Sequence, residues 1–231
     1  MKKEERKNRD KKQMRAVLFD LDGTLVDSEE GITKCVQYAL RDCGIEVPNL
    51  ESLRCFIGPP LEYSFRLRYG MTEEAAWNAV QKYRERYDVK GILECHLYDH
   101  VEEALSRIKE KGYLLALASS KPEIACRHIL ERFHLTSYFD EIVGSTLDGS
   151  ISTKEEVLLE VCRRMSRIDK EQMCLIGDTK YDAIGAAALG IRCIGVSYGF
   201  GTREELLSQG AEIVLDDIRE VESYLEGDME L

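Results

Sequence analysis

The chain has 231 residues, of which 44% are hydrophobic and 32% are charged, the composition of a folded globular protein. No segment approaches the roughly 20 consecutive apolar residues that a membrane-spanning helix needs, and no secretory signal is recognisable. The net charge of -11 argues against a nucleic-acid partner, because backbone phosphates would be repelled. We therefore predict a protein that binds neither membranes nor nucleic acids.

Eight cysteines are spread along the chain without any CxxC pair. This usage fits a reducing compartment better than a disulfide framework, so a cytoplasmic location is expected. Charge is distributed unevenly, since residues 1–15 carry eight Lys/Arg against three Asp/Glu. Residues 1–13 are too polar to build a core, which predicts a disordered basic tail.

Five short runs rich in Val, Ile and Leu predict buried strands, and a sixth is expected near the end of the chain. Helical patterns separate these runs; for example, Val101, Ala104, Leu105 and Ile108 follow i, i+3, i+4, i+7 spacing. Such alternation is typical of an α/β fold, a doubly wound parallel sheet covered by helices on both faces. The runs are Ala16–Phe19, Leu114–Ala118, Ile142–Val143 with its flanks, Met173–Ile176, Ile191–Val196 and Ile213–Leu215.

One region departs from this alternation and contains no convincing strand. Its apolar residues recur at helical spacing, first over residues 32–40 and again over about 72–89. We therefore expect an inserted helical cap at residues 27–96, directly after the first strand. The α/β core would then consist of residues 14–26 and 97–231.

Two carboxylates stand where the first predicted strand ends. Because side chains alternate along a strand, Asp20 and Asp22 lie on the same side beyond its carboxyl end, where α/β sheets bind ligands. Two neighbouring carboxylates shift each other's pKa unless a cation or a proton lies between them. The pair therefore indicates either an acid–base pair or a metal site, although Asp22-Gly23 is also a common turn dipeptide.

The strand predicted at residues 173–176 is also followed by acids. Asp178 comes at its end and Asp182 lies four residues later. Asp178 could simply cap the next helix, whose N-terminus favours negative charge. Two strands that both end in carboxylates nevertheless form an oxygen-rich site that suits Mg²⁺, which takes few protein ligands and keeps waters for a phosphate.

Two further residues suit an anion. Ser119 lies at the end of the second run, before a predicted helix, where hydroxyls and free amides can cradle a phosphate. Serines at this place are usually only helix caps, so Ser119 alone is a weak indication. Lys154 opens another predicted helix, where its charge is unfavourable for the helix dipole. Its position there suggests that it is held for an anion.

In combination, these segments resemble the haloacid dehalogenase superfamily of phosphohydrolases. The resemblance covers nearly the whole chain and rests on DLDGT at 20–24, Ser119, Lys154 and GDTKYD at 177–182. The segments FIGPPLE, SSKPE and IVGSTLDGS are similar to the phosphoglycolate-phosphatase-like subgroup, which has a helical cap after the first strand. The resemblance implies a Rossmann-like core with the first strand at the centre of the sheet.

The same resemblance implies a role for each catalytic residue. Asp20 would attack phosphorus and form an aspartyl-phosphate, while Asp22 would protonate the leaving oxygen and then activate water. Thr24 would position Asp22. Ser119 and Lys154 would hold the phosphoryl oxygens.

The cofactor that the resemblance implies is Mg²⁺. Its ligands would be the Asp20 carboxylate, the backbone carbonyl of Asp22 and the Asp178 carboxylate. Asp182 would support these ligands without binding the metal directly.

The predicted activity is that of a phosphoric monoester hydrolase, and the protein is expected to be a monomer or a weak homodimer. A cap that closes over the site favours a small phosphorylated metabolite over a polymer. The cap contains arginines suited to a carboxylate, so a short phosphorylated acid such as phosphoglycolate is the first choice. These arginines are Arg54, Arg66 and Arg68.

Two alternatives remain open. A 5'-nucleotidase acting on nucleoside monophosphates is the second choice, because the cap aromatics Tyr63, Phe65 and Tyr69 could stack on a base. A catalytically silent regulatory or sensor protein of the same fold is an alternative from a different class. Turnover of an aryl phosphate with Mg²⁺ distinguishes that alternative from the two enzymes.

Overall fold

Six strands form one sheet in the computed structural model, which describes residues 14–227; the tail predicted at residues 1–13 lies outside the described residues. Every pairing in this sheet is parallel, and β1 lies in its interior, so the predicted doubly wound α/β core is confirmed. In spatial order the strands are β5 (Glu141–Ser145), β4 (Leu114–Pro122), β1 (Ala16–Phe19), β6 (Met173–Gly177), β7 (Arg192–Val196) and β8 (Ile213–Leu215).

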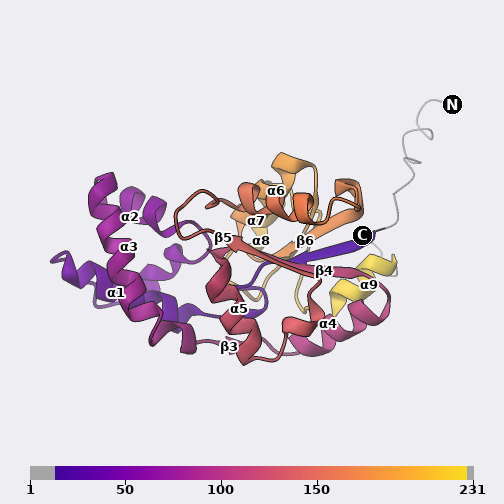
Figure 1. Ribbon diagram of the computed structural model, residues 1–231, viewed down its shortest axis with the longest axis horizontal. Coiled ribbons are helices and arrows are strands. Elements are labelled where there is room, and N and C mark those ends of the chain that lie inside the picture. The colour runs from indigo at the N-terminus through magenta and orange to yellow at the C-terminus, as the bar shows by residue number, and fades with distance from the viewer. Residues whose placement is uncertain (1–13, 228–231) are drawn as a thin grey trace.

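Helices cover both faces of this sheet (Figure 1). Along β1, Val17 and Phe19 belong to one apolar core, whereas Ala16 and Leu18 belong to the core on the opposite face. Each strand therefore buries residues on both sides, which explains its continuous apolar run. One face is covered by α4 (Val101–Glu110), α5 (Glu123–Arg132) and α9 (Glu220–Glu226), and the other by α6 (Lys154–Arg164), α7 (Lys180–Leu189) and α8 (Arg203–Ser208).

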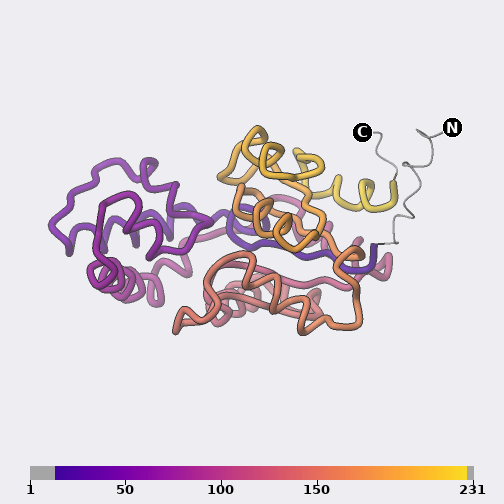
Figure 2. The backbone as a smooth tube through the Cα atoms, turned by 90° about the horizontal axis from the view of Figure 1, so that it is seen from above, coloured from indigo at the N-terminus to yellow at the C-terminus, as the bar shows by residue number. Residues whose placement is uncertain are grey.

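The cap segment, residues 27–96, forms a helical body beyond the carboxyl ends of the strands (Figures 1 and 2). Its buried apolar side chains form a separate cluster, in which Phe56 and Phe65 are almost completely buried. This separate core supports the proposal of an inserted cap. Its helices are α1 (Glu29–Asp42), α2 (Leu61–Tyr69) and α3 (Glu73–Tyr87), with 3-10 turns at Leu50–Phe56 and Gly91–Leu93.

A short antiparallel ribbon joins the two places where the chain passes between the core and the cap segment. Strand β2 (Val26–Asp27) pairs with β3 (His96–Leu97). Two residues are too few to show a strand pattern, so the sequence does not predict this ribbon. The ribbon gives the cap segment a paired attachment to the core.

The cap segment also contacts the core above the strand ends. Phe200, in the loop after β7, and Ala125, in α5, pack with the apolar cluster of the cap segment. Gly58 lies so close to the loop after β6 that a Cβ there would come within 3.3 Å of the Thr179 methyl group. The carboxyl edge of the sheet is therefore covered by the cap segment. Within residues 14–227, no helix combines the length and the apolarity needed to cross a membrane.

Candidate active site and metal centre

Asp20 is held in place by the end of β1. Its backbone N–H donates to Ile176 O at 2.9 Å, which continues the pairing of β1 with β6 by one residue. The chain then turns sharply, because Gly23 has a φ of 86° and its N–H donates to Val26 O at 2.8 Å. This turn leaves both Asp20 and Asp22 buried at the carboxyl edge of the sheet.

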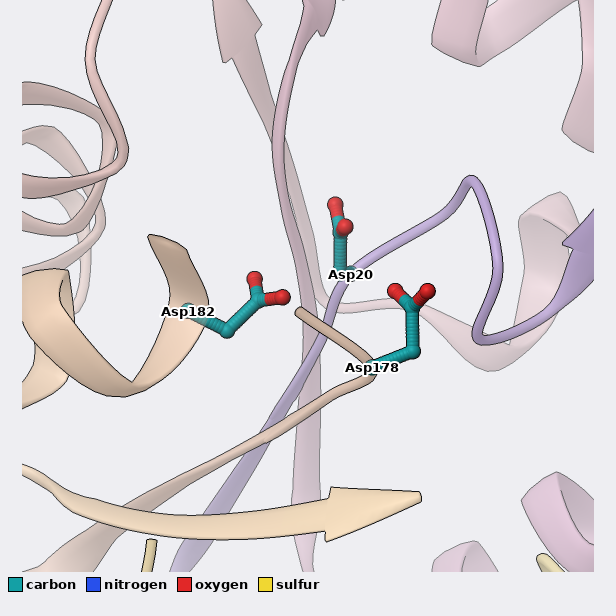
Figure 3. A group of neighbouring side chains, drawn as sticks. All are labelled: Asp20, Asp178 and Asp182. Atoms are coloured by element: carbon teal, nitrogen blue, oxygen red, sulfur yellow. The ribbon is translucent and has the colours of Figure 1, made fainter. Parts of the chain in front are cut away.

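Three carboxylates meet at this edge (Figure 3). Asp20 follows β1, Asp178 follows β6, and Asp182 lies in the first turn of α7. One oxygen of each carboxylate lies within 4.8 Å of the others, and all three side chains are buried. The structure therefore brings together the three acids that the sequence analysis links to magnesium.

Asp178 is fixed by hydrogen bonds to both of its oxygens. The backbone N–H of Phe200 donates to Oδ2 at 2.8 Å, and the Thr24 hydroxyl donates to Oδ1 at 3.3 Å. The expected partner of Thr24 was Asp22, so the structure gives this hydroxyl a different neighbour. Burial, followed by the charges of Asp182 and Asp20, raises the pKa of the Asp178 carboxyl well above its usual value.

Asp182 is oriented by the start of α7. Its Oδ2 accepts hydrogen bonds from the Thr179 backbone N–H and hydroxyl, both at 3.0 Å, which forms a capping box. The residue that caps this helix is thus Thr179 rather than Asp178. With Oδ2 held in this way, Oδ1 of Asp182 is the oxygen that faces the ammonium of Lys154.

Lys154 connects two of the three acids. Its Nζ lies 2.8 Å from Asp20 Oδ1 and 2.8 Å from Asp182 Oδ1, and it donates to Ala118 O at 2.8 Å. Burial alone would lower the pKa of this ammonium, but the charges of Asp182 and Asp20 outweigh burial and raise the pKa. Lys154 therefore stays charged at neutral pH and holds the nucleophile candidate, Asp20, in a fixed position.

The charge of this cluster suits a cation. Of the three buried carboxylates, those of Asp20 and Asp182 pair with Lys154, whose ammonium balances only one negative charge. Apart from the ammonium of Lys154, the buried Oδ1 atoms of Asp20 and Asp182 have no hydrogen-bond donor within residues 14–227. Hard oxygen ligands with unbalanced negative charge are the donors that Mg²⁺ prefers. The residues present therefore fit the expected cofactor.

Lys121 is a buried site residue that the sequence analysis does not single out. Its Nζ lies 2.8 Å from Asp22 Oδ2 and 4.8 Å from the centre of the Tyr87 ring. Burial would lower the pKa of Lys121, but the charge of Asp22 outweighs it, so the pKa is raised well above its usual value. The sequence signal that could have pointed to Lys121 is its position two residues after Ser119, at the end of β4.

Ser119 lies where the sequence predicts it, at the carboxyl end of β4. It pairs with Gly144 of β5, is buried, and its Oγ accepts a hydrogen bond from the backbone N–H of Lys121 at 3.4 Å. Ser119 and Lys154 thus approach the acids from neighbouring elements. Their contacts with phosphoryl oxygens, and the contact of the Asp22 carbonyl with Mg²⁺, stay predictions.

The cap arginines expected to recognise a carboxylate have other surroundings. Arg54 forms an ion pair with Glu29 at 2.7 Å, and Arg66 lies 3.9 Å from Glu62; both arginine side chains are about half exposed. Arg68 is exposed as well. Surface ion pairs of this kind are the ordinary role of helix arginines, so the structure gives no support to their part in substrate recognition.

The cap aromatics are divided between the interior and the surface. The Phe65 and Phe56 rings pack together with their centroids 4.9 Å apart. The centroid of the Tyr69 ring lies 6.2 Å from that of Phe56. Phe65 is fully buried and therefore belongs to the cap core rather than to a base-stacking surface. Tyr63 remains exposed.

Replacing Gly23 with alanine should damage both stability and activity. A Cβ at this position would lie 2.1 Å from Asp178 Oδ2, so the carboxylate has to move. The positive φ alone costs roughly 1–2 kcal/mol for a residue with a side chain. Because a displacement of about 1 Å can cost about 100-fold in rate, we expect a loss of that order in kcat. Urea unfolding and steady-state kinetics measure the two effects.

Gly112 offers a matched control for this variant. Its φ of 87° is nearly the same, but a Cβ there would meet nothing within 4 Å. Gly112→Ala should therefore show the backbone cost without any loss of kcat. Equal activity in the two variants would show that Gly23 is not required to keep space for Asp178.

Comparison with known proteins gives a consistent family assignment. Residues 17–196 match the family model described as haloacid dehalogenase-like hydrolase. A 5'-nucleotidase of Pseudomonas aeruginosa is 41% identical over 91% of this chain and 95% of its own length. A phosphoglycolate phosphatase of the same species is 30% identical over 90% of this chain and 78% of its own length. The tyrosine-protein kinase PtkA of Mycobacterium tuberculosis is 33% identical over 88% of this chain and 71% of its own length.

A solved structure is similar as well. The crystal structure of a predicted phosphatase from Clostridium acetobutylicum has a TM-score of 0.90 and 44% identity, and the match covers 93% of this chain and 99% of that one. The match extends over both the cap segment and the core. Together with the strand-end acids at the carboxyl edge of the sheet, these comparisons show that the chain belongs to the haloacid dehalogenase-like hydrolase family.

Proposed function

We propose that this protein is a Mg²⁺-dependent phosphatase that hydrolyses a small soluble phosphomonoester through an aspartyl-phosphate on Asp20. The observation that carries the proposal is the buried cluster of Asp20, Asp178 and Asp182, two of which pair with Lys154. Membership of the hydrolase family, with relatives named as a nucleotidase and a phosphoglycolate phosphatase, confirms the expected class of phosphoric monoester hydrolase. We further propose a cytoplasmic enzyme that acts as a monomer or weak homodimer.

In the first half-reaction, an Asp20 carboxylate oxygen forms a bond to phosphorus while the bond from phosphorus to the leaving oxygen breaks. The protonated Asp22 carboxyl gives its proton to that oxygen, so the alcohol leaves as a neutral molecule. Lys154 holds Asp20 in place, and Ser119 offers a hydroxyl donor to the phosphoryl group. Bound Mg²⁺ would supply positive charge against the phosphoryl oxygens.

In the second half-reaction, the Asp22 carboxylate accepts a proton from a water molecule whose oxygen bonds to phosphorus. The bond between phosphorus and Asp20 breaks, inorganic phosphate leaves, and both aspartates return to their starting protonation states. The cap segment covers this edge of the sheet, which limits the water present during transfer.

For the substrate, we propose nucleoside monophosphates first and phosphoglycolate second, which reverses the order expected from the sequence. The arginines that favoured a carboxylate are exposed, and two of them pair with glutamates. The relative named 5'-nucleotidase is 41% identical, whereas the one named phosphoglycolate phosphatase is 30% identical. Both substrates remain small phosphorylated metabolites.

A panel of phosphomonoesters tests this proposal. Purified protein with Mg²⁺ is assayed on nucleoside monophosphates, phosphoglycolate, sugar phosphates and a phosphopeptide. We expect the highest kcat/KM on a nucleoside monophosphate and the lowest on the phosphopeptide, because the covered site leaves little room for a polymer. A phosphopeptide with the highest kcat/KM would contradict a small substrate, whereas preference for phosphoglycolate would overturn only the order.

The catalytically silent alternative is tested by the simplest assay. Every side chain that the two half-reactions need is present and buried at one site, which supports an active enzyme. We expect turnover of an aryl phosphate with Mg²⁺. If neither the aryl phosphate nor any member of the panel is hydrolysed, the regulatory or sensor alternative is favoured.

A further inference from the structure

The Asp22 carboxylate has an unusual set of contacts for a proposed acid–base group. Its Oδ2 lies 2.8 Å from Lys121 Nζ, and the two side chains are only 10% and 6% exposed. Its Oδ1 is buried and accepts no hydrogen bond from the part of the chain that the structure describes. The hydroxyl of Thr24, which was expected to hold Asp22, donates to Asp178. Lys121 is thus the charged group that fixes one oxygen of Asp22 and leaves the other without a partner.

A cap residue covers the same ammonium. Lys121 belongs to the core strand β4, whereas the ring of Tyr87, 4.8 Å from its Nζ, belongs to α3 of the cap segment. Tyr87 stacks on Tyr83 with ring centroids 5.2 Å apart and an interplanar angle of 14°, and both rings are buried. The ion pair is therefore enclosed by the cap, where water screens it little and the attraction is strong.

From this geometry we infer that Lys121 is the positioning residue for the acid–base step. It holds Asp22 by Oδ2 under the cap residue Tyr87, so that Oδ1 is the oxygen that transfers the proton. This inference rests on the proposed function, since it assigns a role within the same reaction. It also connects the cap with proton transfer, because the group that orients the acid lies against a cap side chain.

The dependence on the leaving group tests this role. A dinitrophenolate is stable enough to leave without a proton, whereas an alkoxide has to be protonated. Because Asp22 serves as base in the second half-reaction whatever the leaving group, the quantity to measure is the rate constant of the first half-reaction in a single turnover. We compare this rate constant in Lys121→Met, which keeps a long unbranched side chain without the charge, on two substrates. One is dinitrophenyl phosphate, and the other is the alkyl phosphate of the panel that the wild-type protein hydrolyses fastest.

We expect Lys121→Met to lower the rate constant of the first half-reaction on the alkyl ester by about 10²-fold, the size of a typical general-acid contribution, and on the dinitrophenyl ester by less than about fivefold. KM should change little, because the residue acts through Asp22 rather than on the substrate. Lys121→Arg keeps the positive charge and should recover part of the lost rate on the alkyl ester. Tyr87→Leu should shift the ratio of the two rate constants in the same direction by a smaller factor.

A double-mutant comparison separates positioning from a general structural effect. In an Asp22→Asn protein the acid is absent, so adding Lys121→Met should lower the rate constant of the first half-reaction on the alkyl ester by no more than about twofold, against about 10²-fold in the presence of Asp22. Lys109→Met provides a matched control, since Lys109 forms a 2.7 Å ion pair with Asp140 on the surface of the core. It should leave both rate constants unchanged. Melting temperatures of all variants show whether they fold.

Three results would overturn the inference. They are an equal loss on both esters of the rate constant of the first half-reaction, a change confined to KM, and an additive loss in the Asp22→Asn background. An equal loss together with a lowered melting temperature would assign Lys121 to stability alone. If the wild-type protein hydrolyses neither ester, the proposed function fails and the inference fails with it, so the two failures are distinguishable.

Discussion

Replacing Asp20 with asparagine should lower kcat by about 10²-fold or more while leaving the fold intact. A carboxamide cannot attack phosphorus, so the first half-reaction is lost. Stability should be maintained or improved, because Asp20 is buried beside Asp178 and Asp182 and its charge is unfavourable for both neighbours in the metal-free protein. Steady-state kinetics on an aryl phosphate and a thermal melt test these two expectations.

Asp42→Asn is a matched control for this substitution. Asp42 is exposed near the end of α1 in the cap segment and contacts Lys82 at 3.4 Å, and it is not part of the carboxylate cluster. The same chemical change there should alter neither kcat nor the melting temperature. Residual activity of Asp20→Asn above about 1% would contradict its assignment as the nucleophile, because losses at such sites are typically 10²-fold or more.

Removal of divalent metal should abolish turnover, and Mg²⁺ should restore it. The unbalanced charge of the carboxylate cluster requires a cation before an anionic phosphoryl group can bind there. Ca²⁺ should inhibit, because it takes more oxygen ligands than Mg²⁺ and competes for the Asp20 oxygen that has to attack. Full activity in excess chelator would contradict the metal-dependent mechanism.

Metal binding can also be measured without activity. At a concentration of 100 times its Kd, Mg²⁺ stabilises the folded protein by about 2.7 kcal/mol, which corresponds to a rise in Tm of about 5–10 °C for a chain of this size. The rise should be much smaller in Asp178→Asn, which lacks one of the clustered carboxylates. An unchanged rise in that variant would place the metal elsewhere.

The sequence predicts most of the fold because its strands are buried on both faces. Runs such as residues 16–19 and 173–176 are continuously apolar, and in the structure each lies inside the sheet with helices on either side. The β2–β3 ribbon is different. It consists of two residues on each side, so its formation depends on the tertiary approach of the two linkers rather than on a local pattern.

The strand-end acids are predictable for a related reason. In a parallel sheet the carboxyl ends of adjacent strands lie at the same edge, so acids that follow β1 and β6 have to meet. Which hydroxyl then contacts which acid depends on distances of a few tenths of an ångström. The contact of Thr24 with Asp178 instead of Asp22 is a detail of this kind.

Residues that act across the boundary between cap and core are the hardest to predict. Lys121 is one lysine among many in the sequence, and its importance depends on Asp22 and Tyr87, which come from separate parts of the chain. The sequence analysis likewise places Phe65 in the helical cap, but it does not show whether the side chain faces the cap core or the substrate. Packing against Phe56 decides that question.

The central claim, an aspartyl-phosphate on Asp20, is tested most directly by trapping it. Protein mixed with excess substrate and Mg²⁺ is quenched in acid within the first turnovers, digested and analysed by mass spectrometry. We predict the added mass of one phosphoryl group on the peptide that contains Asp20, its loss on treatment with hydroxylamine, and no added mass in Asp20→Asn. A phosphoryl group on another residue, or hydrolysis at the wild-type rate by Asp20→Asn, would contradict this account.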